Sequence, residues 1–348
     1  MPWVRRRPVF PPLSEDLRLA RLAPPGPGTR PAVVIDTDAA NEIDDQFALA
    51  WAALAPERID LRAICAAPFS FAHRRAALQA QHGWDDATAA AMPSFAPPAA
   101  GMARSLDEIR RIGALAGLPV DALACAGSTR YLEGHADAPE RSDAVRRIVA
   151  LADGRDDDPP LVVLALGCPT NIAHALLAEP ALVRRLVVVW TSGFPSHAPH
   201  VNRSFNLEQD PAASRLLLDS GVPLVYLPGF HVGAQLRLSA AEADRHLPGR
   251  GALGDALHAL FVGNPLWPLA GVTGLFAHSW VIWDLICVAW LIEPAWVPSE
   301  LVRTPRLGAD LRWRRGGPGR PLMREAWAVQ RDAIFGDLFR RLDARADS

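Results

Sequence analysis

The sequence of 348 residues contains no lysine, so all 36 residues of the Lys and Arg class are arginines. This excludes every mechanism that depends on a lysine amine, including Walker-type phosphate loops and Schiff-base chemistry. Cysteine is also scarce, and no two cysteines have the paired spacing of a zinc or redox motif. They stand mostly in apolar runs, which is typical of reduced core residues in a cytosolic protein; they are Cys65, Cys125, Cys168 and Cys287.

Long apolar runs are absent as well. No run reaches the length of a membrane span, and the arginines at residues 5–7 are not followed by the apolar core of a signal peptide. The formal net charge is −2, and the arginines form no basic arm or stripe. We therefore expect a cytoplasmic protein that binds neither a membrane nor nucleic acid.

Half of the residues are hydrophobic, and short runs rich in Val, Ile and Leu alternate with helical stretches. This alternation predicts an α/β fold in which a mainly parallel central sheet is covered by helices on both faces, in a Rossmann-like arrangement. Residues 1–30 are rich in Pro and Arg and are expected to form an N-terminal extension. Residues 31–348 are expected to form a single domain. A small hairpin near residues 303–313 and an amphipathic helix over residues 325–342 are expected to close the edge of the sheet.

Two other segments carry specific expectations. Residues 83–101 are rich in Pro and Ala and predict a long loop. Residues 279–290 are almost wholly apolar and predict a buried helix with Asp284 inside it. Because an unpaired buried charge is very costly, Asp284 needs an arginine or a metal ion as its partner.

The most informative stretch is a short apolar strand that runs into a loop with five acidic residues within ten positions, followed by a helix. Such a loop lies beyond the carboxyl end of its strand, where open α/β sheets bind ligands. An Asp at a helix start can be a simple cap, which would explain Asp44 or Asp45 alone. It does not explain Asp36 and Asp38 as well. Clustered carboxylates repel one another, and Ca²⁺ or Mg²⁺ is the simplest compensation.

Three further motifs follow in chain order: Gly167-Cys168-Pro169-Thr170-Asn171, then Phe205-Asn206 with Asp210-Pro211, and Trp283-Asp284. Together with Asp36-Thr37-Asp38 and Asp44-Asp45, they resemble the nucleoside hydrolase family of the inosine/uridine-preferring type. The resemblance extends from about residue 31 to about residue 297.

The resemblance implies a Ca²⁺-dependent enzyme that hydrolyses the N-glycosidic bond of a small-molecule nucleoside or riboside, in a homo-oligomer. It implies a calcium site made by Asp38, Asp45, the carbonyl of Leu166, and Asp284. Asp38 would also be the general base. Asp44 and Asn206 would bind the ribose, with Asn202 as a weaker candidate, whereas Asn171 would cap its helix.

The chain departs from the family pattern in three places that bear on the site. The first loop is two residues longer, which brings Asn41 or Glu42 toward the substrate. Ser204 stands where the family has a glutamate that binds the ribose 5′ hydroxyl. Trp283 stands where a histidine often protonates the leaving base; a tryptophan can stack on a base but cannot protonate it.

The departures leave other interpretations open. One of the four histidines His197, His200, His231 and His278 could replace the missing acid. The chain could also be a catalytically impaired scaffold that binds a nucleoside or sugar. A third alternative is a phosphatase of the haloacid dehalogenase type, because Asp36-Thr37-Asp38 after an apolar strand also suits an aspartyl nucleophile.

Overall fold

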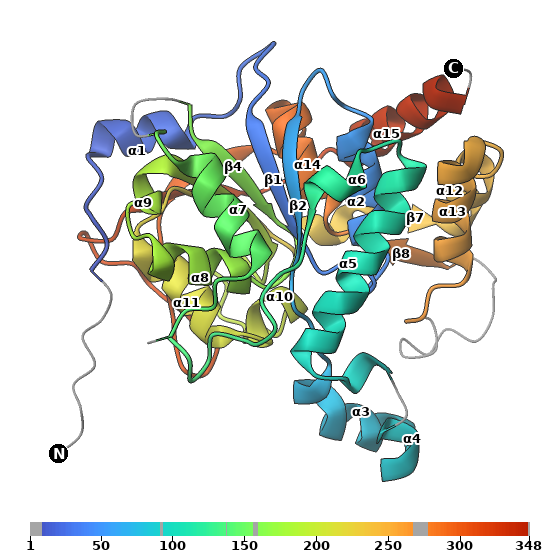
Figure 1. Cartoon of the computed structure of the whole chain (residues 1–348), viewed down its shortest axis with the longest axis horizontal. Helices are drawn as coiled ribbons and strands as arrows, with labels where there is room; N and C mark the ends of the chain where they lie inside the picture. Colours follow the sequence, from blue (N-terminus) through green and yellow to red (C-terminus); the bar gives the residue numbers. More distant parts are fainter. Residues whose placement is uncertain (1–8, 91–92, 137, 156–158, 267–277, 347–348) are drawn as a thin grey trace.

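A computed structural model describes residues 9–90, 93–136, 138–155, 159–266 and 278–346. Its centre is an eight-stranded sheet (Figure 1). In spatial order the strands are β3 (Ala124–Cys125), β2 (Asp60–Ala66), β1 (Ala32–Thr37), β4 (Leu161–Ala165), β5 (Leu186–Ser192), β6 (Leu224–Pro228), β12 (Leu322–Ala326) and β9 (Ser299–Arg303). All neighbouring strands pair in parallel except β9, which is antiparallel to β12.

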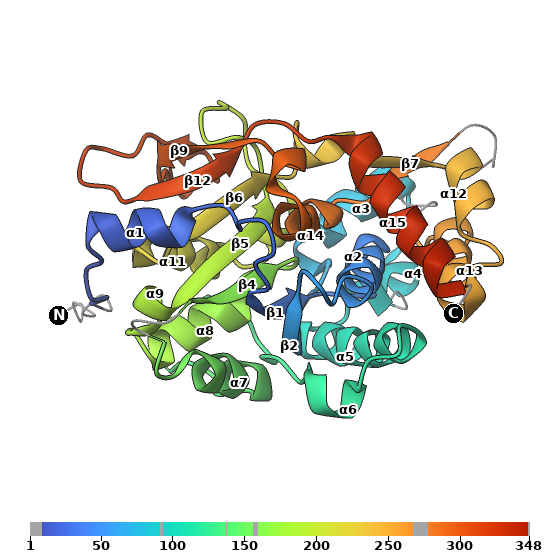
Figure 2. The same ribbon diagram turned by 90° about the horizontal axis from the view of Figure 1, so that it is seen from above.

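Helices cover both faces of this sheet (Figures 1 and 2). The side chains of β1 alternate between the faces, so that Val33 and Ile35 belong to one apolar cluster and Val34 to the other. The first cluster includes residues of α2 (Asp44–Ala53), α5 (Pro98–Leu115), α13 (Gly251–Val262), α14 (Leu285–Ile292) and α15 (Arg331–Ala346). The second includes residues of α7 (Asp143–Ala152), α8 (Thr170–Ala178), α9 (Leu182–Arg185) and α11 (Pro211–Ser220).

The remaining elements are short. The helices are α1 (Glu15–Leu22), α3 (Arg75–His82), α4 (Asp86–Ala90), α6 (Val120–Leu123), α10 (Phe205–Glu208) and α12 (Ala240–His246), with 3-10 turns at Ala72–Arg74, Pro93–Phe95, Gly233–Gln235 and Pro294–Trp296. Two antiparallel pairs lie outside the main sheet: β7 (Arg237–Ser239) with β8 (Ser279–Val281), and β10 (Arg306–Leu307) with β11 (Trp313–Arg314). Among the described residues, no helix has the length and apolar character that crossing a lipid bilayer requires.

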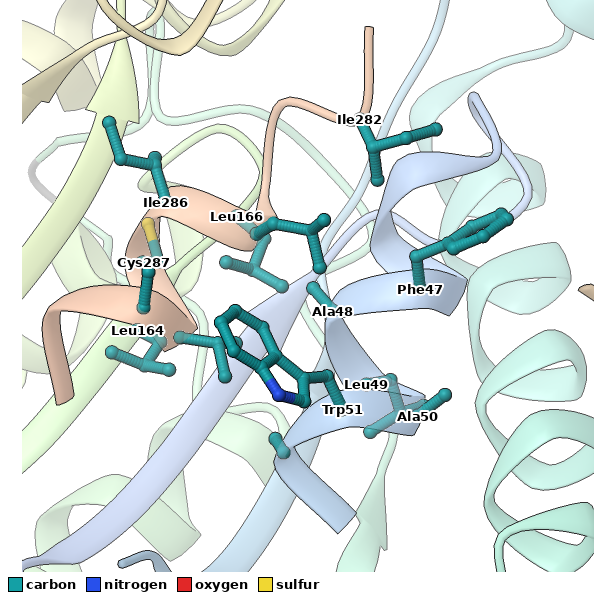
Figure 3. Packing of buried hydrophobic residues seen from close by; sticks show 14 of the residues in the cluster. Phe47, Ala48, Leu49, Ala50, Trp51, Leu164, Leu166, Ile282, Ile286 and Cys287 are labelled. Carbon is teal, nitrogen blue, oxygen red and sulfur yellow. The ribbon is translucent and has the colours of Figure 1, made fainter. Parts of the chain in front are cut away.

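Helix α2 is buried on nearly all sides, and its packing fixes the position of the acidic loop before it. Figure 3 shows its Trp51 near Leu164 of β4 and Cys287 of α14, whereas Phe47 lies on another side of the helix. The Trp51 ring is fully buried, lies parallel to that of Trp296 at 6.4 Å between centroids, and donates from Nε1 to Asp337 of α15 over 2.9 Å. Helix α2 packs against α14 and shares an apolar cluster with β1 and β4, and residues from the segments that precede α2 and α14 line one cavity.

The predicted fold class is confirmed: the sheet is mainly parallel, helices cover both faces, and a small hairpin, β10 with β11, lies near the C-terminus. The prediction of a helix starting at residue 325 is wrong, because Glu325 lies in β12 and helix α15 starts only at Arg331. Leu322–Ala326 has residues that favour helices, but pairing with β6 and β9 outweighs this local preference. The Glu325 carboxylate accepts hydrogen bonds from the backbone and hydroxyl of Ser196.

Two other segment predictions are corrected. Residues 279–290 do not form one helix, because β8 pairs with β7 and α14 begins only after Asp284, which is the N-cap residue. The segment 83–101 is not a plain loop, since it contains α4 and the first turn of α5; residues 91 and 92 lie outside the described part. The N-terminal extension includes α1, which contacts β12, and the boundary at residue 30 stays a prediction.

Candidate active site

The acidic residues gather where several elements end or begin at the carboxyl edge of the sheet. Strand β1 ends at Thr37, and Asp38 follows at once. Asp44 and Asp45 form the first turn of α2, whereas Asp284 caps α14. Since α2 and α14 pack side by side, the chain brings together carboxylates that are about 240 residues apart in sequence.

Three of these carboxylates form a compact group. Asp44, Asp45 and Asp284 each offer an oxygen, and these oxygens all lie within 4.8 Å of one another. The Asp45 carboxylate accepts from the hydroxyl of Thr37 and the backbone N–H of Asp38, and it shares a hydrogen bond with Asp284. All three side chains are buried. The group is therefore held in place from β1, α2 and α14 at once.

Burial raises the pKa of every carboxyl group in this region. The pKa of Asp45 rises to about 6, because desolvation outweighs its hydrogen bonds. The pKa of Glu42 rises to about 7, chiefly through burial and secondly through the charge of Asp45. For Asp44 and Asp284, burial raises the pKa well above the usual range, and the neighbouring carboxylates add to the effect. Full ionisation of this cluster at neutral pH needs a compensating positive charge.

The donor set fits a hard divalent cation. Three carboxylates within 4.8 Å of one another supply oxygen ligands only, which is the chemistry that Ca²⁺ and Mg²⁺ select. The residues around the same cavity include Leu166, whose backbone carbonyl follows β4. None of the four cysteines, which would favour a softer metal, lines this cavity in the described part of the chain.

Asp38 stands beside the compact group and is not a member of it. Its Oδ2 accepts from Asn41 Nδ2 at 3.2 Å, and the Gln209 side chain also hydrogen-bonds it. Burial raises its pKa, and the charges of Asp45 and Glu42 raise it further. The residue at position 167 must be small, because a Cβ there would lie 3.0 Å from the Asp38 carboxyl carbon.

Asn206 lies in α10 and reaches the same region from the other side. Its Nδ2 donates to the carbonyl of Leu166 and, at 3.2 Å, to the carbonyl of Thr191. The predicted metal ligand at Leu166 and the predicted ribose ligand at Asn206 are therefore in direct contact. Two residues that the family resemblance assigns to different ligands thus lie at one point of the site.

These residues surround a single cavity of about 480 Å³. Its acidic part is formed by Asp38, Glu42, Asp44, Asp45 and Asp284. Its aromatic part is formed by Phe205, Phe230, Trp280 and Trp283, and the rings of Phe230 and Trp283 meet edge to face at 6.0 Å. The cavity thus joins an acidic, oxygen-rich wall to an aromatic wall of a kind that stacks on flat rings.

Comparison with known proteins agrees with this geometry. The family model described as "Inosine-uridine preferring nucleoside hydrolase" matches residues 33–332. The chain belongs to this family. Its members are hydrolases of N-glycosyl bonds, so the match assigns the chain to that class of enzymes and not to the phosphatases. The match spans the first acidic loop, α10 and Asp284.

Individual relatives of this nucleoside hydrolase family support the assignment. Over 272 residues the chain is 30% identical to the non-specific ribonucleoside hydrolase RihC of Salmonella enteritidis, with 75% of this chain and 78% of the relative covered. The fold is similar to that of the plant nucleoside hydrolase PpNRh1, with a TM-score of 0.67, 17% identity and coverage of 91% and 100%. It is equally similar to a purine-preferring ribonucleoside hydrolase from Gardnerella vaginalis, at TM-score 0.67, 19% identity and coverage of 90% and 99%.

Most of the predicted site residues of this family member line the cavity, and Asn202 does not. Its side chain is buried elsewhere, where it accepts from the Phe194 backbone at 2.8 Å and donates to the Leu311 carbonyl at 3.0 Å. Glu42 from the longer loop does line the cavity and hydrogen-bonds the Trp280 side chain. Ala40, with φ of 72°, adopts a left-handed conformation in the turn that precedes it.

Asp36 and Asn171 do not line the cavity and instead hydrogen-bond each other inside the fold. The prediction that Asn171 caps α8 is wrong, because Pro169 occupies the cap position. Instead its Nδ2 donates to Asp36 at 2.7 Å and to the Ala66 carbonyl, while its Oδ1 accepts from Ser128. Asp36 is fully buried, which raises its pKa to about 7 although the bond from Asn171 opposes the shift. This pair ties the ends of the central strands together beneath the site.

Sequence reasoning missed the arginines of the cavity and also one aromatic residue. Arg74, Arg203, Arg237 and Phe230 line it but belong to four separate segments. Only Arg203 carried a usable signal, because it directly precedes Ser204 in a predicted motif. The four candidate histidines are not among the described residues that line the cavity. His200 and His231 instead pack against Phe194.

Proposed function

We propose that the protein is a Ca²⁺-dependent hydrolase that cleaves the N-glycosidic bond of a ribonucleoside or a related riboside. The observation that carries this proposal is the gathering of Asp44, Asp45 and Asp284 within 4.8 Å, in a cavity that Asp38 also lines. Family membership provides the reaction class, and the oxygen-only donor set favours calcium as the ion.

The ion would be held by Asp45 and Asp284 of the compact group, by the Leu166 carbonyl, and by Asp38 from beside that group, while Asp44, the third member of the group, would bind the ribose. When bound, calcium lowers the pKa of a water molecule and orients the ribose diol. Asp38 then takes the proton from the attacking water. Its position in the cavity, beside the compact group and hydrogen-bonded by Asn41, suits this transfer.

Cleavage of the bond builds positive charge on the sugar ring. Asp44 and the other carboxylates would stabilise this charge, and their burial strengthens the interaction. Asn206 and Asp44 would hold the diol, which fixes the anomeric carbon opposite the water. Trp283 would stack on the departing base, and Phe230, whose ring is nearly perpendicular to that of Trp283, would contact the edge of the base. Orientation of this kind can supply roughly 7–11 kcal/mol of the barrier.

The test is release of free base from a panel of ribonucleosides, followed by ultraviolet absorbance, with calcium present and after its removal. Asp38→Asn keeps the shape of the side chain but removes the base, so kcat should fall about 10²-fold to 10⁴-fold. The matched control is Asp107→Asn, since Asp107 lies on α5 with its side chain 80% exposed. Full activity in Asp38→Asn would overturn the role of the general base.

A second candidate function is a binding protein that has lost turnover. Ser204 and Trp283 favour it, because neither side chain can act as an acid at its place in the cavity. In that case calcium and ribose would raise the melting temperature, while no nucleoside in the panel would be cleaved. Assembly into a homo-oligomer is a further proposal from the family, and light scattering measures it directly.

A further inference from the structure

We propose, on the basis of the function proposed above, that the substrate carries a phosphate on its ribose 5′ carbon, bound by Arg203 and Arg74. The observation behind this inference is the uneven charge of the cavity. All its carboxylates come from the first loop, α2 and Asp284, whereas the segment around Ser204 contributes no negative charge to the lining. Arg74 and Arg203 line the cavity beside that segment.

Arg74 is held in a fixed orientation. Its Nε donates to Glu208 over 2.5 Å, and its Nη2 donates to the backbone carbonyl of Arg203 over 2.9 Å. The guanidinium also lies over the ring of Phe205, at 5.2 Å from the centroid. Glu208 balances its charge, so Arg74 contributes directed N–H donors more than net charge.

Arg203 supplies the unbalanced positive charge. Its side chain is exposed, and within the described part of the chain it has no ion-pair partner. The Arg74 guanidinium donates to the backbone carbonyl of Arg203, so it lies beside the point from which the Arg203 side chain extends. A guanidinium group offers paired N–H donors that match the oxygens of a phosphate, and a second arginine nearby strengthens this match.

Hydroxyl groups complete the proposed subsite. The Ser204 and Ser192 hydroxyls are 2.7 Å apart, and both residues line the cavity. Each hydroxyl can rotate to donate to an anionic oxygen. A carboxylate at this point would repel a phosphate, which carries a charge of roughly −1.5 to −2 at neutral pH. The hydroxyls and the Arg203 guanidinium therefore favour an anion, while the nearby carboxylate of Glu208 is neutralised by its ion pair with Arg74.

The position of the subsite selects the 5′ carbon. Ser204 is two residues before Asn206, the proposed ligand of the ribose diol, and both lie at the start of α10. A group bound at Ser204 is thus next to the sugar itself. The aromatic wall around Trp283 is formed by other segments and suits the base. A ribonucleoside carries substituents at the diol, the anomeric carbon and the 5′ carbon. Because the diol and the anomeric carbon are already assigned, the subsite takes the group on the 5′ carbon. The cavity volume of about 480 Å³ lies within the usual range of roughly 300–1,000 Å³ for such ligands.

The test compares kcat/KM for a ribonucleoside and its 5′-monophosphate in the wild type and in Arg203→Ala. Because Arg203 is exposed, its replacement should not impair folding. We expect the wild type to prefer the monophosphate, and Arg203→Ala to reduce the ratio of monophosphate to nucleoside by about 10-fold to 100-fold. Orotidine, with a carboxylate on its base, is the third substrate and should gain nothing from Arg203.

Two control variants sharpen the result. Arg237→Ala removes an arginine from the same cavity, but one that lies beside Ser279 on the β7–β8 wall, so it should leave the ratio unchanged. Arg110→Ala removes an exposed arginine that pairs with the exposed Asp107 on α5 and should also leave the ratio unchanged. A wild type that prefers the free nucleoside, or equal losses with both substrates in Arg203→Ala, would overturn the proposal.

Failure of the proposed function gives a different pattern. If no riboside is cleaved, binding of ribose 5-phosphate and of ribose can still be compared by calorimetry. Tighter binding of ribose 5-phosphate that is lost in Arg203→Ala would support the subsite without catalysis. Equal binding of the two sugars would contradict the subsite, whether or not nucleosides are cleaved.

Discussion

Removal of calcium should make the stability of the protein fall as the pH rises from about 4 to 7. In the metal-free protein, burial raises the pKa of Asp45 from 3.8 to about 6. A folded pKa above the unfolded value means that the folded state holds the proton more tightly. The favourable contribution is therefore complete below pH 3.8 and is lost as the pH rises through 6.

The size of this effect follows from the shift. One pKa unit corresponds to about 1.36 kcal/mol, so the metal-free fold loses roughly 3 kcal/mol at Asp45 alone between acidic and neutral pH. Calcium should reverse this loss, because in the proposed site it binds the carboxylates in their ionised form. At a free concentration of about 100 times its Kd, it would add roughly 2.7 kcal/mol.

The assay is urea unfolding of calcium-stripped protein across this pH range, with Asp45→Asn as the comparison. The difference between the two proteins reports the Asp45 carboxyl together with the effect of its charge on the neighbouring carboxyls, since groups far from the site titrate alike in both. Without calcium, the variant should become the more stable protein as the pH rises. With calcium, the wild type should be the more stable one. A difference that stays constant with pH, or that keeps its sign when calcium is added, would refute the reasoning.

Three further predictions concern packing and charge around the site. Gly167→Ala should lower kcat roughly tenfold with little change in melting temperature, because the new Cβ would displace the Asp38 carboxylate by a few tenths of an ångström; an unchanged kcat would contradict this. Burial alone would raise the pKa of Glu208, but the hydrogen bond from His73 and the charge of Arg74 lower that pKa overall. The ionised Glu208 therefore stabilises the fold fully above pH 4.5, and this stabilisation is lost as the pH falls below it. In urea unfolding, Glu208→Gln should thus destabilise the fold at neutral pH by about 1 kcal/mol and by less at pH 3, and a pH-independent effect would count against the ion pair. Trp51→Ala should cost about 3–5 kcal/mol in unfolding free energy, and Trp51→Phe about 1–3 kcal/mol, because Phe keeps a ring but loses the hydrogen bond to Asp337, which stays paired with Arg341. A Trp51→Phe variant as stable as the wild type would show that the hydrogen bond contributes nothing.

The acidic wall of the site could be predicted because its residues follow a clear pattern. Strand β1 ends just before Asp38 and α2 begins at Asp44, so the sequence pattern predicts the strand, the loop and the helix. The grouping of Asp284 with this loop required the family resemblance, since the two lie on α14 and α2 and meet only by packing.

The errors have physical reasons. Asp284 was placed inside a helix because its neighbours are all apolar, and apolar periodicity alone cannot separate a short strand from a helix. Asn202 was chosen for its closeness in sequence to Asn206, but its amide is committed to the loop backbone. Arg74 could not be found, because only the folded chain brings it over Phe205.

Calcium binding measured by isothermal titration calorimetry tests the central claim most directly. The account predicts one calcium ion per chain in the wild type, strongly weakened binding in Asp284→Asn, and unchanged binding in the exposed control Asp107→Asn. A wild type that binds no calcium, or an Asp284→Asn variant that binds it as tightly as the wild type, would contradict the claim that these buried carboxylates share one divalent ion.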